Sequence, residues 1–152
     1  MRKDKNSKGE RGAAALEFAL IFPLLLAIVA GITDFGIAFY NKAMVTSASR
    51  EGARVASLWQ PASLKPSEAE LKGVVKDVLD TTLFKIGSGT IATTFDPPDP
   101  STVPSGAYIK VTVSYAHDYL ILPPIIGLLN MVTGDAFPVT VNLASSTTMR
   151  VE

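Results

Sequence analysis

One continuous run of residues, from Gly12 to Trp59, constrains this chain more than any other feature. It has no cluster of turn-forming residues, so it predicts one long helix. Its first part, residues 13–33, has twenty-one residues and one charged side chain, Glu17. About 20 apolar residues, at about 1.5 Å of rise each, cross the core of a bilayer. The first part can therefore span a membrane.

The second part of the run, residues 34–59, is more polar. It keeps small or apolar residues three and four positions apart, at Met44, Ala48, Gly52, Val55 and Trp59. Residues with this spacing lie near one face of a helix. We expect this part to pack against protein while the first part contacts lipid.

The net charge of zero hides an uneven distribution. Residues 1–12 carry five basic and two acidic side chains, and the rest of the chain carries nine basic and twelve acidic ones. Short basic flanks stay in the cytoplasm, so the C-terminal portion is expected outside the membrane. The acidic excess of that portion argues against a nucleic-acid partner.

The apolar run exceeds the roughly 7 to 15 residues of a secretory signal and contains an acid, so an uncleaved anchor fits better than an ordinary signal peptide. Three regions follow: a basic cytoplasmic leader (1–12), a long helix (13–59, with its membrane part at about 13–34) and a small extracytoplasmic head (60–152). The chain has no cysteine, so packing or neighbouring subunits must hold the head together.

Glu17 lies inside the apolar part. A charged side chain there costs a few kcal/mol and usually has a partner or a function. Alternatively, its carboxylate reaches the headgroups from about one turn inside the boundary. The residues alone leave both interpretations open.

The residues around Glu17 resemble a known pattern. Gly12, four small or apolar residues, Glu17 and Phe18 follow a short basic leader, as in the processing site of type IV prepilins, most closely those of the Flp/Tad branch. The run RGAAALEFAL with Pro23 after it, and the run REGAR at residues 50–54, are similar to TadE-type pseudopilins. The resemblance covers the first sixty residues well and residues 148–152 loosely.

This resemblance implies that a prepilin peptidase cuts between Gly12 and Ala13, which makes Glu17 the fifth residue of the mature chain. The cut would leave an ammonium group on Ala13 at the membrane edge. Glu17 of a neighbouring, axially offset subunit would pair with it and so set the register of a filament. Within one chain the two residues are four apart, so an intrachain contact is the alternative.

Pro23 removes one helical hydrogen bond, so a kink or a local loosening is expected there. Asp34 is expected to close the membrane part, with Phe35, Phe39 and Tyr40 forming an interfacial aromatic belt.

Charged residues follow on the same helix, beyond the membrane. Arg50 and Arg54 are four apart and repel, so an acidic partner from the head or from another subunit is one interpretation, and a solvated charged face is the other. With Glu51, they are candidate subunit contacts.

The head predicts one helix and a sheet. Ser67 and Glu70 form a capping box that starts a helix ending before Gly87, with its apolar face at Leu71, Val74, Val75, Val78, Leu79 and Leu83. Strands are expected at residues 91–95, 108–115 and 137–151, the last two with strict alternation. The fold class is therefore α+β and pilin-like: a long N-terminal helix, then a small antiparallel sheet with one covering helix. The outer end of the long helix should lie against the sheet.

Residues 119–132 are apolar but interrupted by Pro123, Pro124 and Gly127. The segment is too short to span a bilayer, so we expect it to fold into the core. If it is exposed instead, it marks a subunit contact.

No catalytic pattern is present. His117 beside Asp118 indicates a turn more than half of a triad, and Asp96 with Asp99 is weak evidence for a calcium site. We expect no enzyme activity, no cofactor and no metal.

The resemblance implies a minor pilin or pseudopilin, a structural or assembly component of a Tad (tight adherence) pilus. Its partners would be a prepilin peptidase, other pilins, the inner-membrane assembly platform and membrane lipid. It would be a single-pass inner-membrane protein with a cytoplasmic N-terminus and a periplasmic head, or extracellular in a pilus. Two alternatives stay open: an unprocessed membrane-anchored module that binds an envelope ligand, and the major filament subunit.

Overall fold

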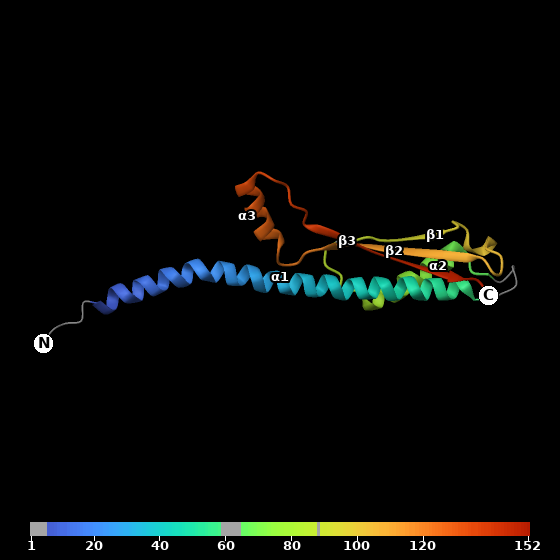
Figure 1. The fold of residues 1–152 in the computed structure, drawn as a ribbon, viewed down its shortest axis with the longest axis horizontal. Coiled ribbons are helices and arrows are strands. Elements are labelled where there is room, and N and C mark those ends of the chain that lie inside the picture. Colours follow the sequence, from blue (N-terminus) through green and yellow to red (C-terminus); the bar gives the residue numbers. More distant parts are fainter. Residues whose placement is uncertain (1–5, 59–64, 88) are drawn as a thin grey trace.

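The computed structural model describes residues 6–58, 65–87 and 89–152, with side chains from Gly12 onward. Its elements are α1 (Asn6–Ser57), α2 (Glu68–Thr82), β1 (Ile91–Asp96), a short 3-10 turn (Pro100–Thr102), β2 (Tyr108–Asp118), α3 (Pro123–Thr133) and β3 (Thr140–Arg150). Figure 1 shows the long α1 extending far beyond a small head made of the other elements. The predicted α+β class is confirmed.

α1 is a single helix of 52 residues, which corresponds to about 78 Å. Pro23 lies inside it without ending it. Figure 1 shows that α1 changes direction in its blue N-terminal part, the part that contains Pro23. The predicted helix end at Trp59 lies outside the described residues.

The three strands form one antiparallel sheet in the order β1-β2-β3. The predicted inner face of β2 is confirmed, because Ile109, Val111, Val113 and Tyr115 are all buried. β2 runs three residues further than predicted, so His117 and Asp118 are its last residues and the predicted turn there is wrong.

The prediction for β3 is partly wrong. The strand begins only at Thr140, and Phe137 and Val139 lie before it with 43% and 42% of their surface exposed. Further along, Ser145 and Thr147 take inner-face positions toward α1. Ser49 of α1 meets both, with its Oγ 2.9 Å from Thr147 Oγ1 and 3.3 Å from Ser145 Oγ. Hydrogen-bonded polar side chains thus continue the inner face of β3, for which the alternating pattern predicted apolar residues.

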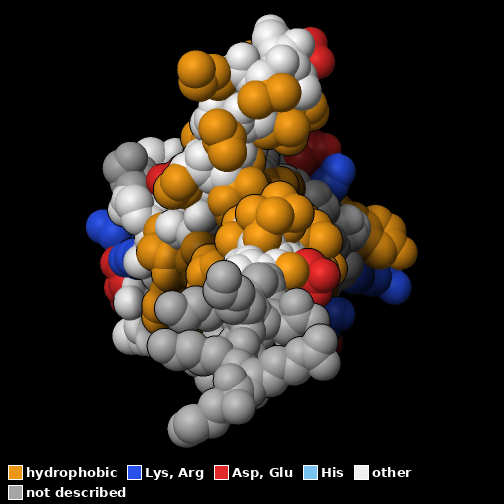
Figure 2. All heavy atoms as spheres, turned by 90° about the vertical axis from the view of Figure 1, so that its left-hand side faces the viewer, with side chains coloured by type: hydrophobic (Ala, Val, Ile, Leu, Met, Phe, Trp, Pro, Cys, Tyr) orange, Lys and Arg blue, Asp and Glu red, His pale blue; other side chains and the backbone are white. Residues whose placement is uncertain are grey.

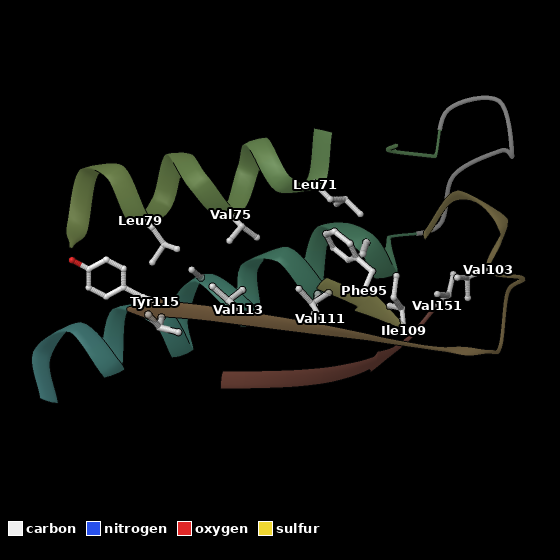
Figure 3. Packing of buried hydrophobic residues seen from close by; sticks show 14 of the residues in the cluster. Leu71, Val75, Leu79, Phe95, Val103, Ile109, Val111, Val113, Tyr115 and Val151 are labelled. Carbon is white, nitrogen blue, oxygen red and sulfur yellow. The ribbon is translucent and has the colours of Figure 1, made fainter. Parts of the chain in front are cut away.

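The core lies between this inner face and two helices, the outer half of α1 and α2. Figure 3 shows Leu71, Val75 and Leu79 of α2 pointing toward the side chains of β2. From α1, the buried contributors are Val45, Ala48, Ala53 and Ala56, together with Gly52. The prediction that the outer end of α1 lies against the sheet is therefore confirmed.

α2 starts as its sequence predicts. The Ser67 hydroxyl accepts the Glu70 N–H at 3.3 Å, and the Glu70 carboxylate accepts the Ser67 N–H at 2.8 Å. The Ser67 hydroxyl also donates to this carboxylate, at 2.8 Å, and the two bonds from the Ser67 N–H and hydroxyl hold the pKa of Glu70 below its usual value because they favour the ionised form. The capping box fixes where the helix begins and thus which face it turns to the core.

The prediction that residues 119–132 fold into the core is wrong. Pro123 and Pro124 begin α3, and no residue of α3 is buried. The physical reason is space, because α1 and α2 already cover the inner face of the sheet. Figure 1 shows α3 standing off the head beside α1.

Gly52 lies where α1, α2 and β2 meet. A Cβ atom there would be 2.7 Å from Cγ2 of Val75 and 3.4 Å from Cγ1 of Val111, and both valines are fully buried. The absence of a side chain at this position is what lets α1 approach α2 and the sheet so closely.

Gly52→Ala should destabilise the head by about 1–2 kcal/mol. Overpacking costs about 1–3 kcal/mol, and the better helix propensity of alanine returns up to about 1 kcal/mol. Gly73→Ala in α2 is the matched control, since its Cβ would meet nothing within 4 Å, and it should stabilise. Denaturant titration of the full chain in detergent measures both, and equal shifts in the two variants would contradict the packing argument.

Candidate assembly site

The N-terminal half of α1 carries apolar side chains that the rest of the protein leaves uncovered. Five of them are between 62% and 73% exposed: Leu16, Phe18, Leu20, Ile21 and Leu24. Within the described residues, α1 is the helix that is long and apolar enough to cross a membrane. Such a surface is suited to lipid or to the helices of other subunits.

The predicted processing and assembly residues Gly12, Ala13, Glu17, Phe18 and Pro23 all lie on this exposed half of α1. Gly12 has nothing within 4 Å of where a Cβ would be. Phe18 stacks on Phe22 of the same helix, with ring centroids 5.2 Å apart.

Glu17 has no ion-pair partner among the side chains from Gly12 onward that the structure describes. Its carboxylate is therefore placed on an otherwise apolar, open surface. It is accessible to a partner from outside this chain.

The charged residues at the other end of α1 are partly paired. Arg54 donates to both carboxylate oxygens of Glu51, at 2.9 Å from Nε and 2.6 Å from Nη2. This hydrogen bonding lowers the pKa of Glu51 and raises that of Arg54. The acidic partner of Arg54 thus comes from its own helix. Arg50 is exposed, so its guanidinium points away from the core.

Asp34 does more than close the apolar run. Only 1% of its surface is exposed. Its carboxylate accepts the backbone N–H groups of Leu120, Ile121 and Leu122, at distances between 2.8 and 3.2 Å. Charge-assisted hydrogen bonds of this kind are the stronger ones, so Asp34 fixes the turn before α3 onto α1.

The three residues of the predicted aromatic belt follow Asp34 on α1. Phe35, Phe39 and Tyr40 are about half exposed or more, at 51%, 72% and 49%. Phe35 meets the ring of Tyr119 edge-on, at 6.1 Å between centroids. The Tyr40 hydroxyl donates to the Thr82 carbonyl at 3.0 Å.

A second polar contact joins α1 to the head about two helical turns after Asp34. Asn41 is buried, and its amide accepts the Phe84 N–H at 2.9 Å and donates to the Phe84 carbonyl at 2.8 Å. These two bonds fix which atom of the side-chain amide is the oxygen and which is the nitrogen. The same Nδ2 group lies 3.2 Å from Nδ1 of His117, so this ring nitrogen must accept and the neutral imidazole carries its proton on Nε2.

His117 is therefore structural. It is fully buried, and its Nε2 has no hydrogen-bond partner in the part of the chain that the structure describes. Burial lowers its pKa, while Asp118 and Asp34 act weakly in the opposite direction.

One of the two acidic residues considered for calcium, Asp99, has another role in the structure. Asp99 accepts the Ser101 N–H at 3.0 Å and its hydroxyl at 2.6 Å, which caps the 3-10 turn. Among residues 6–58, 65–87 and 89–152, no three side chains of metal-ligating type come together.

Comparison with protein families gives one match. The family model of TadE-like proteins covers residues 12–54. This segment is TadE-like. The match begins at Gly12 and contains every predicted site residue, along with Asp34, Asn41 and Gly52. No curated protein and no solved structure matches the chain.

The TadE-like segment is thus α1 almost entire, including the membrane half and most of the half that packs on the sheet. It is consistent with a component of a Tad pilus system that is anchored in a membrane by one helix. The rest of the head, from α2 to β3, lies outside the match. The assembly role of Glu17 stays a prediction. Sequence reasoning missed the structural roles of Asp34, Asn41 and His117, because their partners are distant in the chain.

Asp34→Ala should free the turn before α3. A hydrogen bond to a charged group contributes about 1.5–3 kcal/mol, so the amides of Leu120, Ile121 and Leu122 should exchange with solvent much faster once this acceptor is lost. Asp34→Asn keeps one acceptor oxygen and should restore part of the protection. Hydrogen exchange followed by mass spectrometry measures this, and Asp77→Ala, at an exposed position of α2, is the control. Unchanged exchange in Asp34→Ala would show that the carboxylate does not hold the turn.

His117 should make stability fall as the pH drops below about 6.5, the usual pKa of histidine. Its pKa is lowered in the folded chain, so in this range the unfolded chain binds a proton that the folded chain does not. The contribution is fully present above the unfolded pKa and is lost as the pH falls. Unfolding free energies of the full chain in detergent, compared with those of His117→Gln, test this. The variant should be less stable and should show a shallower pH dependence, and an equal slope would contradict the assignment.

Proposed function

We propose that this chain is a minor pilin or pseudopilin, a non-catalytic structural or assembly component of a Tad-type pilus. The observation that carries the proposal is the TadE-like segment itself, a continuous helix whose N-terminal half exposes an apolar surface with a single carboxylate on it. A helix of this kind can lie in a membrane before assembly and among other helices afterwards.

In this proposal, a prepilin peptidase cuts after Gly12 and leaves an ammonium group on Ala13. Gly12 is exposed and nothing surrounds it within 4 Å of a Cβ position, which supports access by an enzyme. Glu17 then pairs with the ammonium of a neighbouring subunit. Both charges are poorly hydrated at the membrane edge, so their attraction exceeds that in water, although desolvation offsets much of the gain. The pair acts mainly on register.

The remaining partners follow from the same proposal. Other pilins contact the exposed half of α1, and Arg50 with the Glu51–Arg54 pair offers charged contacts at its far end. The inner-membrane assembly platform receives the processed chain. The leader lies in the cytoplasm and the head in the periplasm, or outside the cell once the chain is in a pilus that serves adhesion.

The mature N-terminus tests the proposal. The full chain is expressed in cells that contain a prepilin peptidase and the other Tad components, and its mass is measured after purification from membranes. A chain that begins at Ala13 is expected. A chain that keeps Met1 in such cells contradicts processing and favours an unprocessed anchored module.

Glu17→Gln tests the role of the carboxylate without changing the shape of the side chain. We expect normal membrane insertion and cleavage, but loss of crosslinking to other pilins. Glu68→Gln, an exposed acid of α2, is the matched control and should crosslink like the wild type. Wild-type crosslinking by Glu17→Gln would remove the register argument. Recovery of the chain as the bulk of sheared surface fibres would identify a major subunit instead.

A further inference from the structure

The segment from Tyr119 to Val139, here called the α3 segment, leaves the head between β2 and β3. A hydrogen bond from the Tyr119 N–H to the Val139 carbonyl, at 3.2 Å, closes its base. Its helix exposes Leu128, Met131 and Val132 by 64%, 85% and 77%. Fully burying one such side chain contributes about 1.5–3 kcal/mol, so this surface is unfavourable in water. An isolated helix of 11 residues is also marginal in water.

Most of the backbone positions at the start of α3 need no water as a hydrogen-bond partner. The first four N–H groups of a helix have no partner inside it. Here the Leu122 N–H donates to Asp34 at 2.8 Å, and the next two residues, Pro123 and Pro124, have no N–H. Three of the four positions are therefore accounted for.

At the end of α3, several hydrogen bonds form within the segment itself. Thr133 Oγ1 donates to the Leu129 carbonyl at 3.0 Å, and the Asn130 side chain accepts the Phe137 N–H at 3.0 Å. Gly134, with φ of 76°, adopts the left-handed conformation that lets its N–H reach the Asn130 carbonyl. The groups that are paired at the two ends lower the cost of surroundings without water, where each unpaired backbone group costs several kcal/mol.

The position of α3 relative to α1 indicates what surrounds this helix. Asp34, at the end of the apolar part of α1, holds the turn before it. Figure 1 shows α3 rising steeply from α1 on the side of the membrane half rather than along the head. Figure 2 looks at the protein from the N-terminal end, the direction of the membrane, and shows hydrophobic side chains over the protruding α3. If α1 runs along the membrane normal, α3 lies across it at the level of the boundary.

The distribution of side chains favours lipid over a protein groove. Residues 119–134 contain no charged side chain. Apolar residues are exposed over one broad face of the helix, at Ile125, Leu128, Leu129 and Val132, with Met131 at its edge. An uncharged segment offers a partner groove no charge to recognise, whereas the boundary region of the bilayer that receives the exposed half of α1 can take up one broad apolar face.

We propose that α3 is a second membrane contact, which inserts into the leaflet on the side of the head and lies across α1 at its exit point. This rests on the proposed insertion of α1. Asp34 then couples the two helices, so that the head cannot tilt or sink independently of the membrane helix.

Fluorophore quenching in vesicles tests the proposal. The chain has no cysteine, so single cysteines can be labelled without other changes. Met131→Cys, labelled with an environment-sensitive fluorophore, is reconstituted as the full chain in phosphatidylcholine–phosphatidylglycerol vesicles. We expect a blue-shifted emission and stronger quenching by a nitroxide placed near the headgroups than by one deep in the acyl chains. Leu128→Cys, one turn earlier, repeats the measurement.

Two control positions separate the possible failures. Leu25→Cys, in the membrane half of α1, should be quenched by the deep nitroxide, and Thr148→Cys, on the uncovered face of the sheet, by neither. Quenching at 25 without quenching at 131 and 128 overturns the proposal and leaves the membrane anchor intact. A blue shift at 131 that appears only at high protein-to-lipid ratio also overturns it, because a second copy then covers α3. Absence of quenching at 25 overturns both the anchor and the α3 contact.

Discussion

The head depends on a helix that continues out of the membrane half into its core. Val45, Ala48 and Ala53 of α1 are fully buried against the sheet, and α2 alone would leave β3 uncovered. Burial of apolar surface is the dominant favourable term in folding, and here the long helix supplies a large part of it. Head and membrane helix are therefore one mechanical unit, and any displacement of α1 during assembly displaces the head with it.

Small residues let α1 approach the sheet but do not by themselves fix its rotation. Polar pairs do, because a buried polar group that loses its partner is costly. Asn41 and Phe84 exchange two hydrogen bonds at one level, and Asp34 holds three amides at another. Ser49, facing Ser145 and Thr147, provides a third level. Together these contacts fix the rotation of α1 about its own axis, and with it the direction in which Glu17 and Arg50 face.

The sequence predicted what depends on local periodicity and failed where distant partners decide. The capping box of α2 and the alternation of β2 are local signals, and both were confirmed. Asp34 looked like a boundary marker because its amide partners lie 86 to 88 positions away. Residues 119–132 were predicted to lie in the core because their apolar composition indicates burial. Composition does not show which surface covers them. Only the structure shows that the inner face of the sheet is already full and that α3 stands apart from it.

The two carboxylates of the apolar part lie near its two ends. Glu17 and Asp34 are seventeen residues apart, which is about 26 Å along a helix and close to the roughly 30 Å core of a bilayer. Among the side chains that the structure describes, Glu17 has no ion-pair partner, whereas Asp34 accepts three amides of its own chain, so the proposed pairing with a neighbouring subunit is open to Glu17 and not to Asp34. If α3 lies in lipid, leaving the membrane uncovers its side chains at the same moment as those of α1. In the proposed function, extraction is then favourable only where other subunits cover both helices, which would couple release from the bilayer to entry into the filament.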